Sequence, residues 1–220
     1  MPAPDSARSY GTVVRTFFAG AEVVRSAIAD PTVVAAWSRP SVLEGQLVGG
    51  LAGHLARGGA WVVTELLDAG PTQAPVTLHT AAAYVATVVS EAPPSTHQVN
   101  RDRGAEIGAV GPATLASQLD ERLADLRDRL PGLDPATPVE VVGGHVVALE
   151  PFLLTRLVEQ VVHLDDLARS VQREPRAYPA DGYDIVLAIG MDVARAKSGP
   201  DALLRALYRK GFVDGVLPVL

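Results

Sequence analysis

The segment RLVEQVVHLDDL, which spans Arg156–Leu167, contains residue types that bind metal ions and transfer protons. Glu159 and His163 are four positions apart and Asp166 follows three positions later, so a helix would place these side chains on one face. Carboxylates and neutral imidazoles are frequent ligands of divalent metals. The solvated polar face of an ordinary amphipathic helix has the same pattern. On this segment alone, a metal-binding edge and a solvated face are both open.

A second histidine, His54, lies in the sequence LAGHLARG and interrupts an apolar helical stripe. The stripe consists of Leu43, Leu47, Leu51 and Val62. An unpaired polar group buried there would cost about 1–3 kcal/mol, so His54 is either hydrogen-bonded to a backbone carbonyl or bound to a metal. Together with Glu159 and His163 it would form a set of two imidazoles and one carboxylate. Three protein ligands leave one coordination position open, as in catalytic zinc sites.

Several helices are needed to bring these residues together, and apolar spacing with proline and glycine breaks predicts where they lie. We expect helices over residues 10–29, 31–37, 41–68, 78–90, 112–130, 151–171, 181–197 and 200–210. The polar, proline-containing stretch 91–104 is predicted to be a loop, and VEVVGGHVVAL, residues 139–149, a small β-hairpin. Each of the six glycines within 41–68 costs about 1 kcal/mol relative to alanine in a helix. Either tertiary packing overrides this preference or backbones approach closely there.

The fold class that follows is mostly α, a bundle of long antiparallel helices with one β-hairpin. We expect a single domain over residues 1–220, in which residues 172–220 form a C-terminal helical extension packed on the bundle.

The composition restricts the class of protein. Of the 220 residues 48% are hydrophobic, enough for a sizeable core, and the net charge of −6 argues against a nucleic-acid partner. The absence of cysteine excludes disulfides, thiolate ligands and an internal thiol nucleophile. No apolar run reaches membrane-spanning length, and MPAPDSARSYGTVVR lacks the pattern of a signal peptide. A cytoplasmic protein without a membrane partner is therefore expected.

Two segments, WSRPSVLEGQLVGGLAGHLARG and RLVEQVVHLDDLARSV, resemble the DinB-like superfamily, and within it the mycothiol-dependent maleylpyruvate isomerase N-terminal domain family. The residues that carry the resemblance are Trp37, Pro40, Ser41, His54, Leu55, Arg156, Glu159, His163, Asp166 and Leu167. The resemblance implies a DinB-like four-helix bundle. It also implies a divalent metal, usually zinc, held by His54, Glu159 and His163.

The sequence departs from this family before the first histidine. The family often has Gly-Trp-Ser/Thr followed by an aspartate, whereas here Gln46 and Leu47 follow Gly45, and Gly50 stands at the acidic position. These positions are expected near the mouth of the bundle, where substrate or thiol binds. The isomerase itself carries a separate C-terminal domain, whereas residues 172–220 here are predicted to form two helices. Maleylpyruvate isomerisation is therefore not predicted.

A bound metal would allow a small-molecule thiol, such as mycothiol, to be activated as a thiolate that attacks an electrophilic carbon. Asp166 and Arg156 are the candidate catalytic residues. Asp166 would orient a ligand or accept a proton, or it is a surface charge; Arg156 would bind a substrate carboxylate, although an ion pair with Glu159 is favoured. His97, Arg101 and Arg103 lie in the predicted loop. They are the candidates for binding the thiol cosubstrate.

Two alternatives use the same bundle. A non-catalytic protein would bind a metal or ligand without turnover, and a metal-dependent hydrolase would use bound water and need no thiol. The predicted partners are a small-molecule thiol and an electrophilic substrate. The apolar tail FVDGVLPVL is predicted to pack either against a second copy in a homodimer or against its own bundle.

Overall fold

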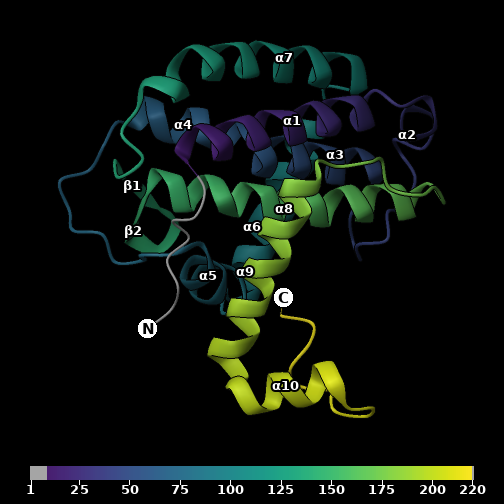
Figure 1. Cartoon of the computed structure of the whole chain (residues 1–220). Coiled ribbons are helices and arrows are strands. Elements are labelled where there is room, and N and C mark those ends of the chain that lie inside the picture. The colour runs from purple at the N-terminus through teal and green to yellow at the C-terminus, as the bar shows by residue number, and fades with distance from the viewer. Residues whose placement is uncertain (1–8, 220) are drawn as a thin grey trace.

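Four helical segments pack into a ring around the hydrophobic core in this computed structural model, which describes residues 9–219 (Figure 1). One of the four segments contains a short π-helical stretch, η1, between two α-helices. The bundle consists of α1 (Tyr10–Ile28), α3 (Val48–Ala56) continued by η1 (Arg57–Trp61) and α4 (Val62–Ala69), α7 (Pro112–Arg129), and α8 (Leu149–Ser170). Within the ring α8 lies against α1 and α3, and α7 closes the opposite side. The predicted mostly α fold with a small hairpin is confirmed.

Apolar stripes on the bundle helices explain why they form. Phe17 on α1 and Phe152 on α8 are almost completely buried, as are Leu51 and Leu119 on α3 and α7. Burying a side chain of this size contributes about 1.5–3 kcal/mol. The ends of the helices also carry the expected signals: the Asp30 carboxylate accepts a hydrogen bond of 2.8 Å from the Thr32 amide and caps α2 (Pro31–Ala35).

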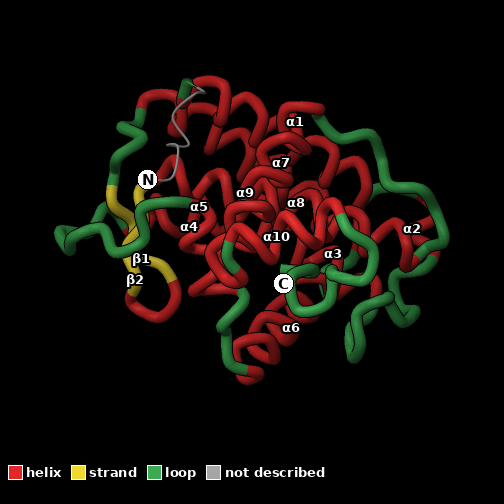
Figure 2. The backbone as a smooth tube through the Cα atoms, turned by 60° about the horizontal axis from the view of Figure 1, so that its bottom comes forward, coloured by secondary structure: helices red, strands yellow, loops and turns green. Residues whose placement is uncertain are grey.

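The predicted β-hairpin is confirmed, and it leads directly into the helix that carries Glu159 and His163. Strands β1 (Pro138–Val141) and β2 (His145–Ala148) pair antiparallel. The turn between them contains Gly143 and Gly144 with φ angles of 81° and 73°, which glycine adopts without strain. Figure 2 shows the two short strands at one edge of an otherwise helical molecule.

Two further helices follow the bundle. Helix α9 (Ala180–Ser198) packs on α8 through buried apolar residues such as Ile185 and Ile189, and α10 (Pro200–Tyr208) packs on α9 away from the bundle (Figure 1). Exposed apolar side chains on α10 and the tail include Leu204, Leu207, Tyr208, Phe212 and Val213. The homodimer stays a prediction, as does the assignment of residues 1–220 to one domain.

The predicted helix over 41–68 is wrong at its start. The chain forms turns from Ser41 to Gln46, because the Ser41 hydroxyl contacts the Leu43 amide at 3.1 Å and Gly45 adopts a φ of 74°. Helix α3 begins only at Val48. Likewise, the helix expected over 78–90 begins at α5 (Ala81–Tyr84), capped by Thr80, and continues as the π-helical segment η2 (Val85–Val89).

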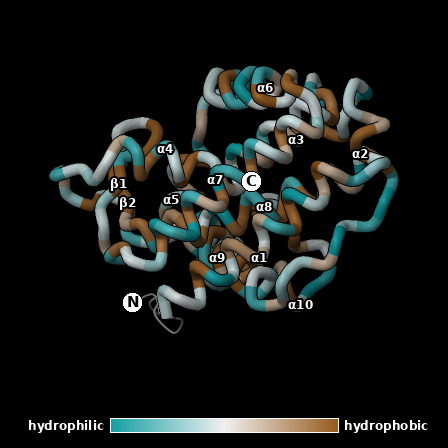
Figure 3. Tube along the Cα trace, turned by 90° about the horizontal axis from the view of Figure 1, so that it is seen from above, coloured by the Kyte–Doolittle hydropathy of each residue, from teal (hydrophilic) through white to brown (hydrophobic). Residues whose placement is uncertain are grey.

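The predicted loop over 91–104 is also wrong, because it forms most of helix α6 (Pro94–Gly108). This helix packs closely against α3, and Figure 3 shows the two side by side at the edge of the bundle. Among the residues of α6 whose burial the structure describes, those that are buried are Gly104 and Gly108 rather than large apolar side chains. The helix therefore lacks the apolar periodicity from which a buried helix is predicted.

Glycines on both helices allow α3 and α6 to approach. A Cβ atom at Gly53 would lie only 2.2 Å from the carbonyl oxygen of Gly104, and one at Gly108 only 2.0 Å from the carbonyl oxygen of Gly49. Trp37 lies in the connection between α2 and α3. Its indole donates a 3.0 Å hydrogen bond to the Gly108 carbonyl and so joins this connection to α6. The expectation of close backbone approach is confirmed at these positions.

No helix in residues 9–219 combines the length and the apolar character needed to cross a membrane. The N-terminal stretch MPAPDSARSYGTVVR, which lacks the pattern of a signal peptide, begins with residues 1–8, and these lie outside the described part of the chain. The remaining residues of that stretch belong largely to α1.

Candidate metal centre

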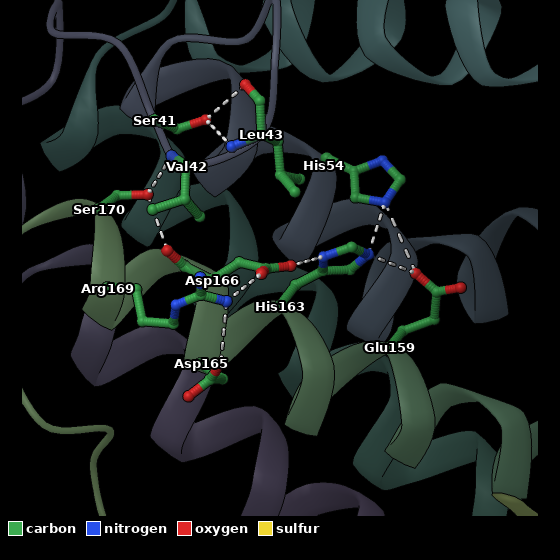
Figure 4. Close-up of polar contacts among 10 residues, drawn as sticks. All are labelled: Ser41, Val42, Leu43, His54, Glu159, His163, Asp165, Asp166, Arg169 and Ser170. Carbon is green, nitrogen blue, oxygen red and sulfur yellow. Dashed lines mark hydrogen bonds and ion pairs between the residues drawn. The ribbon is translucent and has the colours of Figure 1, made fainter. Parts of the chain in front are cut away.

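His54 from α3 and the pair Glu159 and His163 from α8 meet between the two helices (Figure 4). The Nε2 atoms of His54 and His163 are 3.2 Å apart. Each of these nitrogens lies 3.6 Å from Oε2 of Glu159. Three donor atoms from two helices therefore form a compact triangle, as the spacing within α8 and the position of His54 predicted.

The size of this triangle fits a divalent metal. Zinc binds imidazole nitrogens and carboxylate oxygens at about 2.0–2.2 Å, and two ligands of a tetrahedral ion at that distance are about 3.4 Å apart. The observed separations of 3.2, 3.6 and 3.6 Å lie on either side of this value. An ion above the plane of the triangle would have a fourth position open. The geometry thus defines a candidate metal site with the chemistry of two imidazoles and one carboxylate.

Asp166 orients one of the two histidines. Its Oδ2 atom is 3.0 Å from Nδ1 of His163, and since a carboxylate only accepts hydrogen bonds, Nδ1 carries the proton. The Nε2 lone pair of neutral His163 then points to the centre of the triangle. The Asp166 carbonyl in turn accepts a 2.7 Å hydrogen bond from Ser170, whose hydroxyl oxygen accepts one of 3.0 Å from the Val42 amide (Figure 4).

The charges in the site act on each other. Burial alone would raise the pKa of Glu159, but a hydrogen bond from His54 and the positive charges of Arg156, His163 and His54 hold that pKa well below its ordinary value. Burial would lower the pKa of His163, but the hydrogen bond to Asp166 and the charges of Glu159 and Asp166 raise it overall. The carboxylate is thus ready to bind a cation, whereas at His163 a proton competes with the cation up to a higher pH than at an isolated histidine.

The interpretation of this α8 face as solvated is wrong. The side chains of Glu159, His163 and Asp166 are 19%, 19% and 13% exposed, and that of His54 is 23% exposed. The polar face of α8 is directed at α3, so the bundle covers it while leaving it partly accessible. A helical wheel distinguishes polar from apolar faces but does not show which neighbour covers the polar one.

Arg156 lies deeper than the ligands. It is only 5% exposed, and its guanidinium donates to the Gly58 carbonyl at 3.0 Å and to the Thr155 hydroxyl at 2.7 Å. It also stacks on the Phe152 ring, 4.5 Å from the centroid. The favoured ion pair with Glu159 is not formed. The catalytic role assigned to Arg156 stays a prediction, and the contacts of its side chain are with the protein interior.

The three candidates for cosubstrate binding lie on α6 rather than in a loop. His97 and Arg103 are exposed, and Arg101 is half-buried, with a 2.7 Å hydrogen bond to Gln98. Helix α6 reaches the candidate metal site at Gly104, where an added Cβ would lie 2.9 Å from the Cβ of His54. The cosubstrate role of the three residues stays a prediction, and they lie on a helix that contacts the candidate ligand His54.

Sequence reasoning missed Gln160, which is fully buried next to Glu159. Its amide donates to the Gly59 carbonyl at 2.8 Å and its oxygen accepts a 2.5 Å hydrogen bond from the Tyr178 hydroxyl. The only sequence signal for this contact was the adjacent pair Gly58–Gly59, since paired glycines in a helix permit another chain to come close. A glutamine at this position of α8 carries no such signal.

A helical bundle that presents two imidazoles and a carboxylate from two of its helices has the donor set of bundle proteins that build metal sites between facing helices. Comparison with family models specifies the class further. The mycothiol maleylpyruvate isomerase N-terminal domain model matches residues 17–168, which is more than half of the chain, and the chain belongs to this family. The match includes His54, Glu159 and His163 and ends within α8, before α9 and α10. No curated protein and no solved structure matches the chain.

Proposed function

We propose that this protein is a divalent-metal-dependent thiol transferase or isomerase that activates a low-molecular-weight thiol, such as mycothiol, for attack on a small electrophile. The observation that carries the proposal is the triangle of His54, Glu159 and His163, whose edges match tetrahedral coordination with one position open. Family membership supports a thiol as the ligand of the open position. Zinc suits this donor set, and a cytoplasmic location is part of the proposal.

The residues of the chain divide the work as follows. When bound, the metal would lower the pKa of a thiol at the open position, so that the thiolate is present at neutral pH. His54, Glu159 and His163 hold the ion, and Asp166 keeps the proton of His163 on Nδ1, which leaves Nε2 free to bind. The protein has no cysteine, so the attacking sulfur comes from the cosubstrate. His97, Arg101 and Arg103 on α6 are proposed to bind its polar groups.

Metal content and thiol-dependent turnover test the proposal together. Untagged protein is analysed by inductively coupled plasma mass spectrometry and then assayed for consumption of electrophiles with and without mycothiol. We expect nearly one equivalent of zinc or another divalent ion, lost in His54→Ala and His163→Ala. His79→Ala is the matched control, because His79 is exposed and lies outside the site.

Each of the other outcomes would lead to a different conclusion about the function of the protein. Protein that takes up no metal even after reconstitution would contradict the proposal. Bound metal without any thiol-dependent turnover would favour a non-catalytic metal- or ligand-binding protein. Turnover that needs metal but no thiol would indicate a hydrolase that uses bound water.

A further inference from the structure

Arg156 and Gln160, which lie on either side of the candidate ligand Glu159 in the sequence, donate hydrogen bonds to the backbone of η1. Arg156 donates to the Gly58 carbonyl at 3.0 Å, and Gln160 donates to the Gly59 carbonyl at 2.8 Å. Both carbonyls belong to η1, the π-helical segment that follows His54 within one turn. Side chains of α8 therefore bind consecutive carbonyls of the segment that directly continues α3, the helix that carries His54.

Glycine at these two positions brings η1 unusually close to α8. A Cβ at Gly58 would lie 2.8 Å from Oε2 of Glu159, the oxygen that faces both histidines. A Cβ at Gly59 would lie 3.0 Å from Cγ of Gln160. The backbone of η1 at Gly58 therefore packs directly against the Glu159 carboxylate.

The two contacts are strongly favoured because both side chains are buried. Arg156 is 5% exposed and Gln160 is fully buried, and a buried polar group without a partner is unfavourable. Arg156 is held by Thr155 and the Phe152 ring, and Gln160 by the Tyr178 hydroxyl. Neither side chain is free to follow η1 if that segment shifts. Their contacts therefore define how α3 and η1 sit on α8.

We propose that Arg156 and Gln160 are positioning residues that, with Gly58, set the orientation of the Glu159 carboxylate and the distance of His54 from the α8 ligands. This inference rests on the proposed metal site. Arg156, Gln160 and His163 follow a spacing of four and three residues, so they share the α8 face that is directed at α3 and η1. π-Helical segments occur frequently at functional sites, and here the segment places its carbonyls within reach of α8.

The test replaces single elements of this arrangement and measures the metal directly. Gly58→Ala puts a methyl group against the Glu159 carboxylate, and Arg156→Lys keeps the charge but loses the forked donor geometry. The matched control is Gly190→Ala on α9, where an added Cβ meets no atom within 4 Å. The readouts are the zinc dissociation constant, from competition with a chromophoric chelator, and the visible spectrum of the cobalt(II) form, which reports coordination geometry.

We expect Gly58→Ala and Arg156→Lys each to weaken zinc binding by about tenfold and to alter the cobalt spectrum, while far-ultraviolet circular dichroism stays that of the wild type. Gly190→Ala should leave both readouts unchanged. If Gly58→Ala does not fold, Arg156→Lys and Gln160→Met carry the test.

Wild-type affinity and an unaltered cobalt spectrum in the folded variants would overturn the positioning role while leaving the metal site intact. Wild-type protein that binds no metal would overturn both this inference and the proposed function. Metal binding that depends on Arg156 and Gly58, without thiol-dependent turnover, would support the positioning role and contradict only the proposed chemistry.

Discussion

At the scale of single residues, the candidate centre depends on hydrogen bonds that decide which atom of each side chain is available. Nδ1 of His163 is hydrogen-bonded to the Asp166 carboxylate. The Ser170 hydroxyl donates a hydrogen bond to the backbone carbonyl of Asp166. Such outer partners fix the orientation and the protonated nitrogen of a ligand histidine. Asp166, which the sequence left between a catalytic and a surface role, is therefore best understood through its contact with His163.

Removing the Asp166 carboxylate should weaken metal binding. In Asp166→Ala the His163 ring loses the acceptor that orients it, and we expect zinc affinity to fall by about tenfold or more. Titration with a competing chelator measures the change. Asp165→Ala is the control, because the Asp165 side chain is half-exposed and its ion pair is with Arg169. Equal affinities of the two variants would show that Asp166 does not position His163.

Metal affinity should rise with pH through the neutral range. His163 has a pKa above its ordinary value of about 6.5, so a proton competes with the metal to a higher pH than at an isolated histidine. Each displaced proton makes the affinity change by about tenfold per pH unit. Glu159, whose pKa is lowered, stays ionised throughout and adds no slope. Titration calorimetry in buffers of different ionisation enthalpy counts the released protons, and a flat profile from pH 6 to 8 would contradict this assignment.

In the metal-free protein, the contribution of His163 to the free energy of unfolding should instead fall as the pH rises. A raised pKa of His163 in the folded state stabilises the fold fully below about pH 6.5, the ordinary histidine value. That contribution is lost as the pH rises through the pKa of the folded state. Chemical denaturation of the metal-free protein as a function of pH measures this change.

At the scale of elements, glycines make the close contacts of α3 with α6 and of η1, which continues α3, with α8. Gly53 meets α6, and Gly58 and Gly59 meet α8. The cost of these glycines in helix propensity is offset by contacts that no larger residue permits. The N-terminus of α3 is less well supported, because Leu47 occupies the N-cap position and its side chain makes no capping hydrogen bond.

A capping side chain at position 47 should stabilise the protein. Leu47 already has the extended backbone conformation of an N-cap, with φ −79° and ψ 160°, and is half-exposed, so little packing is lost on replacement. We expect Leu47→Ser to raise the free energy of unfolding by about 1 kcal/mol relative to Leu47→Ala, which lacks the hydroxyl. Urea denaturation measures the difference, and equal stability of the two variants would contradict it.

At the scale of the whole molecule, the candidate ligands join helices that are distant in the chain. His54 belongs to α3 and His163 to α8. The family match covers both residues, and it stops before α9 begins. A bound ion would therefore connect two sides of the bundle as well as provide a reactive centre. The C-terminal segment is tied to the same region through the Tyr178 hydroxyl on Gln160.

Zinc should accordingly stabilise the entire fold. A ligand that binds only the native state at a hundred times its dissociation constant adds about 2.7 kcal/mol, which corresponds to about 5–10 °C in the melting temperature of a protein of this size. Differential scanning calorimetry with zinc and after treatment with a chelator measures the shift. His54→Ala should show little or none, and a shift of wild-type size in that variant would place the bound zinc elsewhere.

The sequence by itself determined the features that depend on local spacing. The pattern within α8 placed Glu159, His163 and Asp166 on one face, and paired glycines in an alternating stretch predicted the hairpin. His54 was recognisable because a histidine within an apolar stripe needs a partner. These inferences hold because helical and strand periodicities are properties of neighbouring residues.

Only the tertiary structure decided how these elements meet. It placed His54 within 3.2 Å of His163, turned the polar face of α8 inward, and buried Arg156 against the Gly58 carbonyl. It also formed α6 where the sequence predicted a loop, because a helix that packs through glycines has no apolar stripe to reveal it. Contacts between residues about a hundred positions apart depend on backbone approach and packing, which local periodicity does not encode.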